Sequence, residues 1–324
     1  MTRMDLRVQL FGRVARLASI AQMDDARVRR AQTQQLGHNV VTDLLFGAVA
    51  KGARLGDGTA AGQDGPLPVR VYRRQQPAAG PRPLVLNFHG GGWVLGGLDT
   101  ADWLCSSVAV GLDAVVVSLD YRLAPGHRFP AAAEDCYAAL VDVVGRAAEL
   151  GADPGRVAVM GDSAGGNLAA VVSVMARDRS GPTITHQGLL YPATDLTMAS
   201  PSIDENASAP VLTKADMLAF RAHYLGDGDP RQPYASPLLA DDLTGLPPAL
   251  VQVAEHDPLR DDGLRYAEAL RAAGVPVRVT EYTGMPHGYL SFPRLCRSAP
   301  QALAELVADQ RAVLAAPAER TTSS

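Results

Sequence analysis

The chain has 324 residues, of which 47% are hydrophobic and 20% charged, and its formal net charge is −4. This is ordinary globular usage, so the composition excludes a disordered or fibrous chain. A slightly acidic balance without a recognisable binding module also argues against nucleic acid as a partner. No stretch supplies the roughly 18 consecutive apolar residues that a membrane span needs, so stable membrane insertion is not expected.

The cysteines and the first residues bear on the compartment. Cys105, Cys136 and Cys296 are widely spaced and form no C-x-x-C pattern, so they predict neither a metal site nor a set of disulfides. Arginines recur through the first 16 residues, where a secretory signal would need an uninterrupted apolar segment. We therefore expect a cytoplasmic protein.

Residues 1–52 are predicted to be a helical arm that forms part of a cap. Apolar residues recur there at three- and four-residue spacing, with arginines between them (Leu6, Leu10, Val14 and Leu17). The first part of the core, residues 53–194, opens with a stretch rich in Gly and Pro that contains one alternating strand at 67–72.

From residue 84 onward, strands and helices alternate. Strands are predicted at 84–88, 114–119, 157–160, 188–191, 249–253 and 277–280, and helices at 131–150, 167–177, 263–273 and 301–315. This order is typical of an α/β fold with a mostly parallel sheet and helices on both faces. Residues 195–226 interrupt the alternation and are predicted to be a cap insertion, after which residues 227–324 complete the core.

Residues 161–165 read Gly-Asp-Ser-Ala-Gly, which matches the G-x-S-x-G nucleophile elbow. In that motif a strand turns so sharply into a helix that the residues beside the serine must be small. The predicted strand before the motif and the predicted helix after it supply this context. Ser163 is therefore the candidate nucleophile.

Residues 89–93 read His-Gly-Gly-Gly-Trp and follow a buried strand. Successive glycines leave backbone N–H groups uncovered, and such groups can converge on the oxygen that becomes negative when a carbonyl is attacked. The candidate donors are the N–H groups of Gly91, Gly92 and Ala164. His89 is expected to brace the loop by hydrogen bonding.

A nucleophilic serine also needs a base and a carboxylate that orients the base. Asp257 and His287 each follow a predicted strand, as Ser163 does, and the carboxyl ends of parallel strands meet at one edge of a sheet. Their chain order is Ser, Asp, His, as in α/β-hydrolases. Rivals remain for both partners: Glu255, Asp261 and Asp262 for the acid, and His38, His127, His186, His223 and His256 for the base.

Five blocks in this order resemble the bacterial hormone-sensitive lipase family of esterases. They are HGGGW at 89–93, DYRLAP at 120–125, GDSAGGN at 161–167, DPLRD at 257–261 and PHG at 286–288. The resemblance covers about residue 67 to the C-terminus. The chain departs from the family pattern at Gly126, where a glutamate is usual, which puts a local ion pair in doubt rather than the chemistry.

The resemblance implies an α/β-hydrolase fold, no cofactor and no metal, and hydrolysis of short- to medium-chain acyl esters by a serine carboxylesterase. It also implies that the arm and the 195–226 segment cover the site, and that the chain forms a homodimer. Trp93 and Asp162 are candidate pocket residues, and Asp195, Tyr224 and Phe292 are further side chains that either reach the site or pack elsewhere.

Two other functions fit parts of the same pattern. An amidase or deacetylase would use the same three side chains, because the difference between them and an esterase lies in the pocket and in protonation of the leaving group. A ligand-binding protein of the same fold would lack the histidine, which is present here as His287.

Overall fold

The computed structural model describes residues 4, 6–15, 19–33, 37 and 39–315. Its centre is a sheet of eight strands in the order β1-β2-β4-β3-β5-β6-β7-β8. The strands are β1 (Ala53–Gly62), β2 (Gly65–Arg74), β3 (Arg82–Phe88), β4 (Val115–Leu119), β5 (Ala152–Asp162), β6 (His186–Leu190), β7 (Ala249–His256) and β8 (Val277–Pro286).

The sheet is mostly parallel, as predicted. Strands β3 to β8 pair in parallel, whereas β1 pairs with β2 and β2 with β4 in antiparallel fashion. Every residue of β4 and β6 is buried, which is the pattern expected of parallel strands covered on both faces. The six parallel strands direct their carboxyl ends to one edge of the sheet.

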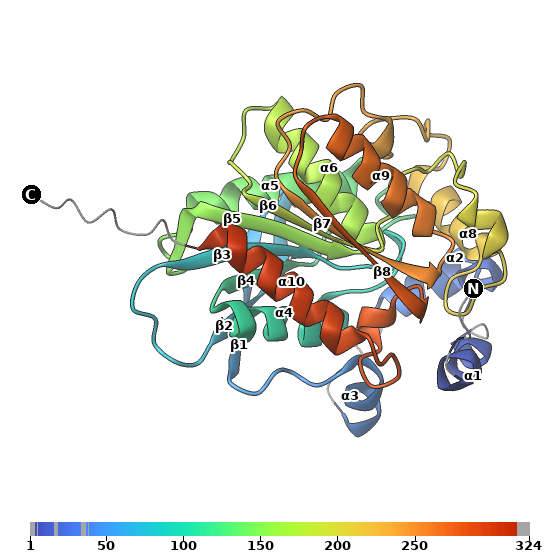
Figure 1. The fold of residues 1–324 in the computed structure, drawn as a ribbon, viewed down its shortest axis with the longest axis horizontal. Helices are drawn as coiled ribbons and strands as arrows, with labels where there is room; N and C mark the ends of the chain where they lie inside the picture. Colours follow the sequence, from blue (N-terminus) through green and yellow to red (C-terminus); the bar gives the residue numbers. More distant parts are fainter. Residues whose placement is uncertain (1–3, 5, 16–18, 34–36, 38, 316–324) are drawn as a thin grey trace, which may run out of the picture.

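Two layers of helices cover the sheet (Figure 1). One layer contains α4 (Leu98–Leu112) and α10 (Ala299–Leu314), and the other contains α5 (Ala131–Gly145), α6 (Ala164–Asp178) and α9 (Arg260–Ala272). Side chains of β3 alternate between the two: Leu84 and Leu86 pack in the core under α5, α6 and α9, and Val85 packs under α4 and α10. No helix in the described ranges has the length and apolar character required to span a membrane.

Two of the longer elements of the fold were not predicted. The first is β1, whose ten residues include three glycines and no regular apolar alternation. It forms because it pairs with β2 along its whole length, from Ala53 opposite Arg74 to Gly62 opposite Gly65. The second is α4, although Ala101, Leu104, Val108 and Leu112 are buried at helical spacing and could have identified it.

The arm consists of short helices rather than one long one. They are α1 (Leu6–Ala15), the 3-10 helix η2 (Ile20–Gln22), α2 (Asp25–Gln32) and α3 (Val40–Phe46). The predicted apolar position Leu17 lies outside the described residues. The side-chain amide of Gln32 ties the arm to the core, because it donates to the carbonyl oxygens of Val94 at 2.8 Å and Ala124 at 2.7 Å.

The segment 195–226 contains α7 (Ser202–Glu205) and α8 (Lys214–Leu225), with the 3-10 helices η3 (Pro237–Leu239) and η4 (Tyr289–Ser291) elsewhere in the core. Helix α8 and the arm gather beyond the carboxyl ends of the strands (Figure 1). Asp216 joins them. It forms a capping box with Thr213, the N-cap residue of α8. Its carboxylate also accepts hydrogen bonds from the Ser19 hydroxyl and, at 3.4 Å, from the Ala21 N–H.

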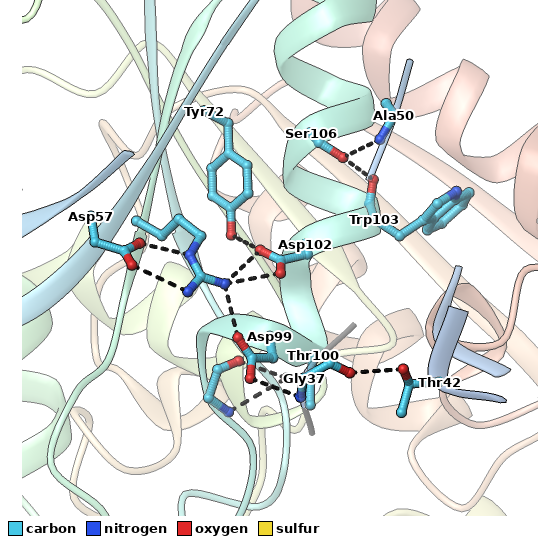
Figure 2. A network of polar contacts seen from close by, with 12 residues as sticks. Gly37, Thr42, Ala50, Asp57, Tyr72, Asp99, Thr100, Asp102, Trp103 and Ser106 are labelled. Atoms are coloured by element: carbon cyan, nitrogen blue, oxygen red, sulfur yellow. Dashed lines mark hydrogen bonds and ion pairs between the residues drawn. The ribbon is translucent and has the colours of Figure 1, made fainter. Parts of the chain in front are cut away.

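An ion-pair network fastens the antiparallel edge of the sheet to α4. Arg70 on β2 forms ion pairs with Asp57, Asp99 and Asp102 at 2.7 to 2.9 Å. Figure 2 shows these three carboxylates turned toward one guanidinium group. The Tyr72 hydroxyl donates to Asp102 at 2.6 Å. Since the Asp102 side chain is 1% exposed, water does not reach its carboxylate, and these partners compensate its negative charge instead.

Replacing Arg70 by methionine should lower the free energy of unfolding by about 2 to 4 kcal/mol, because it removes the cation beside a buried carboxylate. Chemical denaturation of R70M and wild type measures this. The matched control is Arg54→Met, an exposed arginine on the neighbouring strand β1, which should change stability by no more than about 0.5 kcal/mol. Equal effects of the two substitutions would contradict this account of the network.

Candidate active site

Ser163 sits at a sharp turn between β5 and α6. Its φ of 56° and ψ of −117° lie in a region that residues other than glycine rarely adopt. Such a conformation costs on the order of 1 to 3 kcal/mol and persists only when the surroundings enforce it. Here β5 holds the preceding residue and α6 begins at the next, so the Ser163 side chain is presented at the carboxyl edge of the sheet.

The two flanking glycines are required by the close approach of backbone to backbone at this turn. A Cβ on Gly165 would lie 1.8 Å from the Phe88 carbonyl oxygen of β3, and a Cβ on Gly161 would lie 2.2 Å from the Gly165 carbonyl oxygen. These contacts explain why glycines occupy both ends of the Gly-Asp-Ser-Ala-Gly sequence. The turn therefore depends on the packing of α6 against β3.

The three predicted side chains meet in one hydrogen-bonded chain. Nε2 of His287 lies 2.9 Å from the Ser163 hydroxyl oxygen, and Nδ1 of His287 lies 2.7 Å from Oδ2 of Asp257. Asp257 is fully buried, and its other carboxylate oxygen accepts a hydrogen bond from the Leu259 N–H at 2.8 Å. Each residue directly follows a strand: β5, β7 and β8 end at Asp162, His256 and Pro286.

The rival acids have other partners. Glu255 accepts a hydrogen bond from the Gly284 N–H at 2.7 Å and so supports the end of β8. Asp261 pairs with Arg260. Asp262 accepts from the N–H groups at 194 and 195, each at 3.0 Å, and holds the start of the segment 195–226.

Among the rival histidines, His186 is buried against Asp309 at 2.8 Å, and His223 lies 3.9 Å from Asp25. Neither His127 nor His256 lines the cavity described below, and His38 lies outside the described residues. His287 is therefore the histidine that the structure brings to Ser163.

The glycine loop after β3 faces Ser163. Gly91 and Gly92 have φ values of 114° and 63°, and Cβ atoms there would lie 2.2 Å from the Leu95 carbonyl oxygen and from the Phe220 ring. Among the described residues, the N–H groups of Gly91, Gly92 and Ala164 have no hydrogen-bond acceptor. They remain available to a ligand.

His89 braces this loop from below. Its ring stacks on Tyr121 with centroids 4.3 Å apart, its Nδ1 lies 2.8 Å from the Gly90 carbonyl oxygen, and the Tyr121 hydroxyl donates to the His89 carbonyl at 2.7 Å. Burial lowers the pKa of His89, so the ring is neutral and donates through Nδ1.

Comparison with known proteins identifies the family. Residues 85–291 match the model of a family described as having an alpha/beta hydrolase fold. The chain belongs to this alpha/beta hydrolase family. The predicted fold class and the predicted resemblance to hormone-sensitive lipase-like esterases are thereby confirmed, together with the predicted enzyme class, a serine hydrolase.

Curated relatives and solved structures agree with this assignment. The chain is 48% identical over 244 residues to the esterase LipI of Mycobacterium tuberculosis, covering 74% of this chain and 76% of LipI. It is 37% identical over 247 residues to an ethyl acetate hydrolase of Pseudomonas putida, covering 74% and 77%. The solved hyperthermophilic esterase of Pyrobaculum calidifontis superposes with a TM-score of 0.84 at 37% identity, over 96% of this chain and 99% of that one.

Within this alpha/beta hydrolase site, Asp162 supports the glycine loop. Its Oδ1 accepts a hydrogen bond from the Gly90 N–H at 2.8 Å, and a Cβ on Gly90 would lie 2.4 Å from its Oδ2. Burial raises the pKa of Asp162 to about 6, against the opposing effect of the Gly90 N–H. The carboxyl that was predicted as a pocket residue thus lies in the wall of the cavity and holds the loop.

A cavity of about 460 Å³ opens beside Ser163 and is lined by residues of the core, the arm and the segment 195–226. The predicted Trp93, Asp162, Asp195 and Phe292 line it, whereas Tyr224 does not and instead stacks on Trp93 at 4.4 Å. Sequence reasoning missed lining residues from α3 and α8, because no local pattern shows where a helix outside the sheet packs. These are Phe46, Met217, Phe220 and Arg221.

Asp262, in the first turn of α9, is a fully buried residue whose carboxyl lies in the wall of this cavity. Burial raises its pKa to about 7, and the nearby Asp195 also raises it, while hydrogen bonds from Ser200 and from two backbone N–H groups lower it. A folded-state pKa above the usual 3.8 means that the folded protein binds a proton which the unfolded chain has already lost. The protonation of Asp262 therefore adds its full amount to the free energy of unfolding below pH 4, and this amount is lost as the pH rises through 7.

Asp262→Asn should remove this dependence on pH. Between pH 5 and pH 8, wild type should lose about 2 to 3 kcal/mol more of its free energy of unfolding than D262N does. Denaturant unfolding at the two pH values measures the difference. Asp241→Asn, at an exposed position, is the control and should follow wild type. Parallel losses in D262N and wild type would show that Asp262 titrates normally.

Proposed function

We propose that the protein is a serine carboxylesterase in which Ser163 is the nucleophile, His287 the general base and Asp257 the orienting carboxylate. The observation that carries this proposal is the unbroken chain of contacts, 2.9 Å from Ser163 to His287 and 2.7 Å from His287 to Asp257. The buried carboxylate fixes the tautomer with the proton on Nδ1, which leaves Nε2 free to take the serine proton. That its relatives are named esterases supports the choice of reaction.

The proposed reaction has two halves. The Ser163 oxygen attacks the ester carbonyl while Nε2 of His287 accepts the serine proton, and the alcohol leaves with that proton. Water then attacks the acyl-enzyme with His287 again as base, and the acid is released as the serine regains its proton. Asp257 stabilises the imidazolium in both halves without changing its own protonation.

The negative oxygen formed in each half is proposed to bind the N–H groups of Gly91, Gly92 and Ala164. Their lack of acceptors among the described residues and their position beside Ser163 support this role. Ala164 begins α6, so its N–H also belongs to the positive end of the helix dipole. Each such donor is worth on the order of 10² to 10³ in rate.

The arm, residues 1–52, and the insertion, residues 195–226, are proposed to act as a cap that limits the substrate to short- and medium-chain acyl esters. Phe46 from the arm and Phe220 from the insertion both line the cavity, which supports this role. The expected homodimer and the expected cytoplasmic location stay predictions.

Ser163→Ala should lower kcat for p-nitrophenyl butyrate by a factor on the order of 10⁴ to 10⁶, because the three side chains act as a unit. Asp257→Asn should cost a factor on the order of 10³ to 10⁴, because it disturbs the tautomer and leaves the nucleophile in place. Steady-state hydrolysis by the purified variants measures both.

A fluorophosphonate probe serves as the control for nucleophilicity. Wild type should be labelled on Ser163, and S163A should not be labelled at all. Retained hydrolysis in S163A would refute the assignment of the nucleophile. Labelling of Ser163 combined with cleavage of p-nitroanilides in preference to esters would favour the amidase alternative.

The cavity wall also predicts the dependence on acyl length. Activity on p-nitrophenyl esters should be greatest for short and medium chains and should fall for long ones, because the cavity is bounded by Phe46 and Phe220. Phe46→Ala should shift the optimum toward longer chains. Leu44→Ala, on the same helix but 61% exposed, is the matched control and should keep the wild-type profile. An unchanged profile in F46A would mean that the acyl chain does not reach the arm.

A further inference from the structure

One cavity-lining residue has a charge that the proposed reaction does not use. Arg221 is a half-buried residue of α8, and Met217, Phe220 and Arg221 of that helix all line the cavity. Their spacing places them on one face of the helix. Because the Phe220 ring lies against Gly92, this face of α8 directly covers the glycine loop beside Ser163.

The guanidinium of Arg221 makes fewer hydrogen bonds than it has donors. It carries five N–H donors, and within the described part of the chain its hydrogen bonding consists of one bond, from Nη1 to the Leu196 carbonyl oxygen at 3.3 Å. None of the described carboxylates lies within ion-pair distance of it. The remaining donors have no acceptor in that part of the protein.

The carboxyl groups that line the same cavity are already engaged. Asp195 pairs with Arg265 at 2.9 Å. Asp262 accepts hydrogen bonds from the Ser200 hydroxyl and from backbone N–H groups, and Asp162 accepts from Gly90. Arg265 balances the charge of Asp195, so the charge of Arg221 is left without a counterion at this wall.

The rest of this wall favours a strong interaction with an anion. Neighbouring lining residues are apolar (Met198, Val211, Leu212 and Met217). Charge-assisted hydrogen bonds strengthen in such surroundings, and the planar guanidinium matches a carboxylate with two parallel bonds.

We propose that Arg221 is a specificity-determining residue that binds a carboxylate on the substrate, so that the preferred esters carry a free acid group, as a monoester of a dicarboxylic acid does. This inference rests on the proposed esterase function. Arg221 is given no part in the bond-making steps, and its effect is on which ester is bound productively.

The test compares two phenyl esters of equal chain length, phenyl hydrogen adipate and phenyl hexanoate, by release of phenol. Wild type should hydrolyse both.

Arg221→Met should lower kcat/KM for the acid ester by about 10- to 100-fold, which is the effect of losing a charge-assisted pair. It should change kcat/KM for the neutral ester by less than about threefold. Arg221→Lys, which keeps the charge but loses the planar fork, should fall between wild type and R221M. Arg231→Met, at an exposed arginine outside the cavity, is the matched control and should leave both values unchanged.

A measurement on wild type tests the proposal without a substitution that could disturb folding. Adipate monoanilide should inhibit hydrolysis of phenyl acetate more strongly than hexananilide does, and this advantage should shrink as sodium chloride is added. Equal inhibition by the two anilides would overturn the proposal.

Three further outcomes of the ester assay would contradict the proposed role of Arg221. An equal loss on both esters in R221M would mean that Arg221 merely positions the cap through Leu196. No loss on either, or hydrolysis of the hexanoate alone by wild type, would overturn the carboxylate site while leaving the esterase function intact. If wild type hydrolysed neither ester and Ser163 were not labelled by the fluorophosphonate, the proposed function itself would fail and this inference with it.

Discussion

The turn at Ser163 is the constraint on which the rest of the site depends. A serine with φ of 56° is unfavourable on its own, and it is held because α6 packs so closely on β3 that only hydrogen fits at Gly161 and Gly165. The same approach brings the glycine loop, which leaves β3 at Phe88, alongside the start of α6. The proposed nucleophile and the proposed N–H donors therefore share one structural cause, the contact between a helix and the neighbouring strand.

Asp257 and His287, the proposed carboxylate and base, are placed by the sheet rather than by the turn. Strands β7 and β8 run parallel to β5, so the residues that follow them arrive at the same edge. Glu255 and Asp262, which compete with Asp257 on sequence grounds, instead fix the end of β8 and the start of the cap segment. Acidic residues close in the chain thus serve different purposes: Glu255 lies within β7, Asp257 directly follows it and Asp262 lies in the first turn of α9, so each meets a different neighbour.

The sequence was most informative where a local pattern has a single structural solution. The elbow, the three glycines after β3 and the residues following β7 and β8 were predicted by number, and the structure brings these residues to one edge of the sheet. The sequence was least informative where an element forms only because it packs against or pairs with another element. Strand β1 has a sequence that would form no strand alone and is held by ten paired positions on β2. The cavity wall is a similar case, since Phe46 and Arg221 reach it only through the packing of α3 and α8.

The central claim is that the N–H groups of Gly91, Gly92 and Ala164 surround an oxygen bound to the carbon or phosphorus that Ser163 attacks. The most direct test is a crystal structure of the protein after reaction with a dialkyl fluorophosphate. We expect a bond from the Ser163 oxygen to phosphorus, with the phosphoryl oxygen about 2.7 to 3.1 Å from those three nitrogens. Phosphorus on another residue, or a phosphoryl oxygen turned away from the glycine loop, would contradict it.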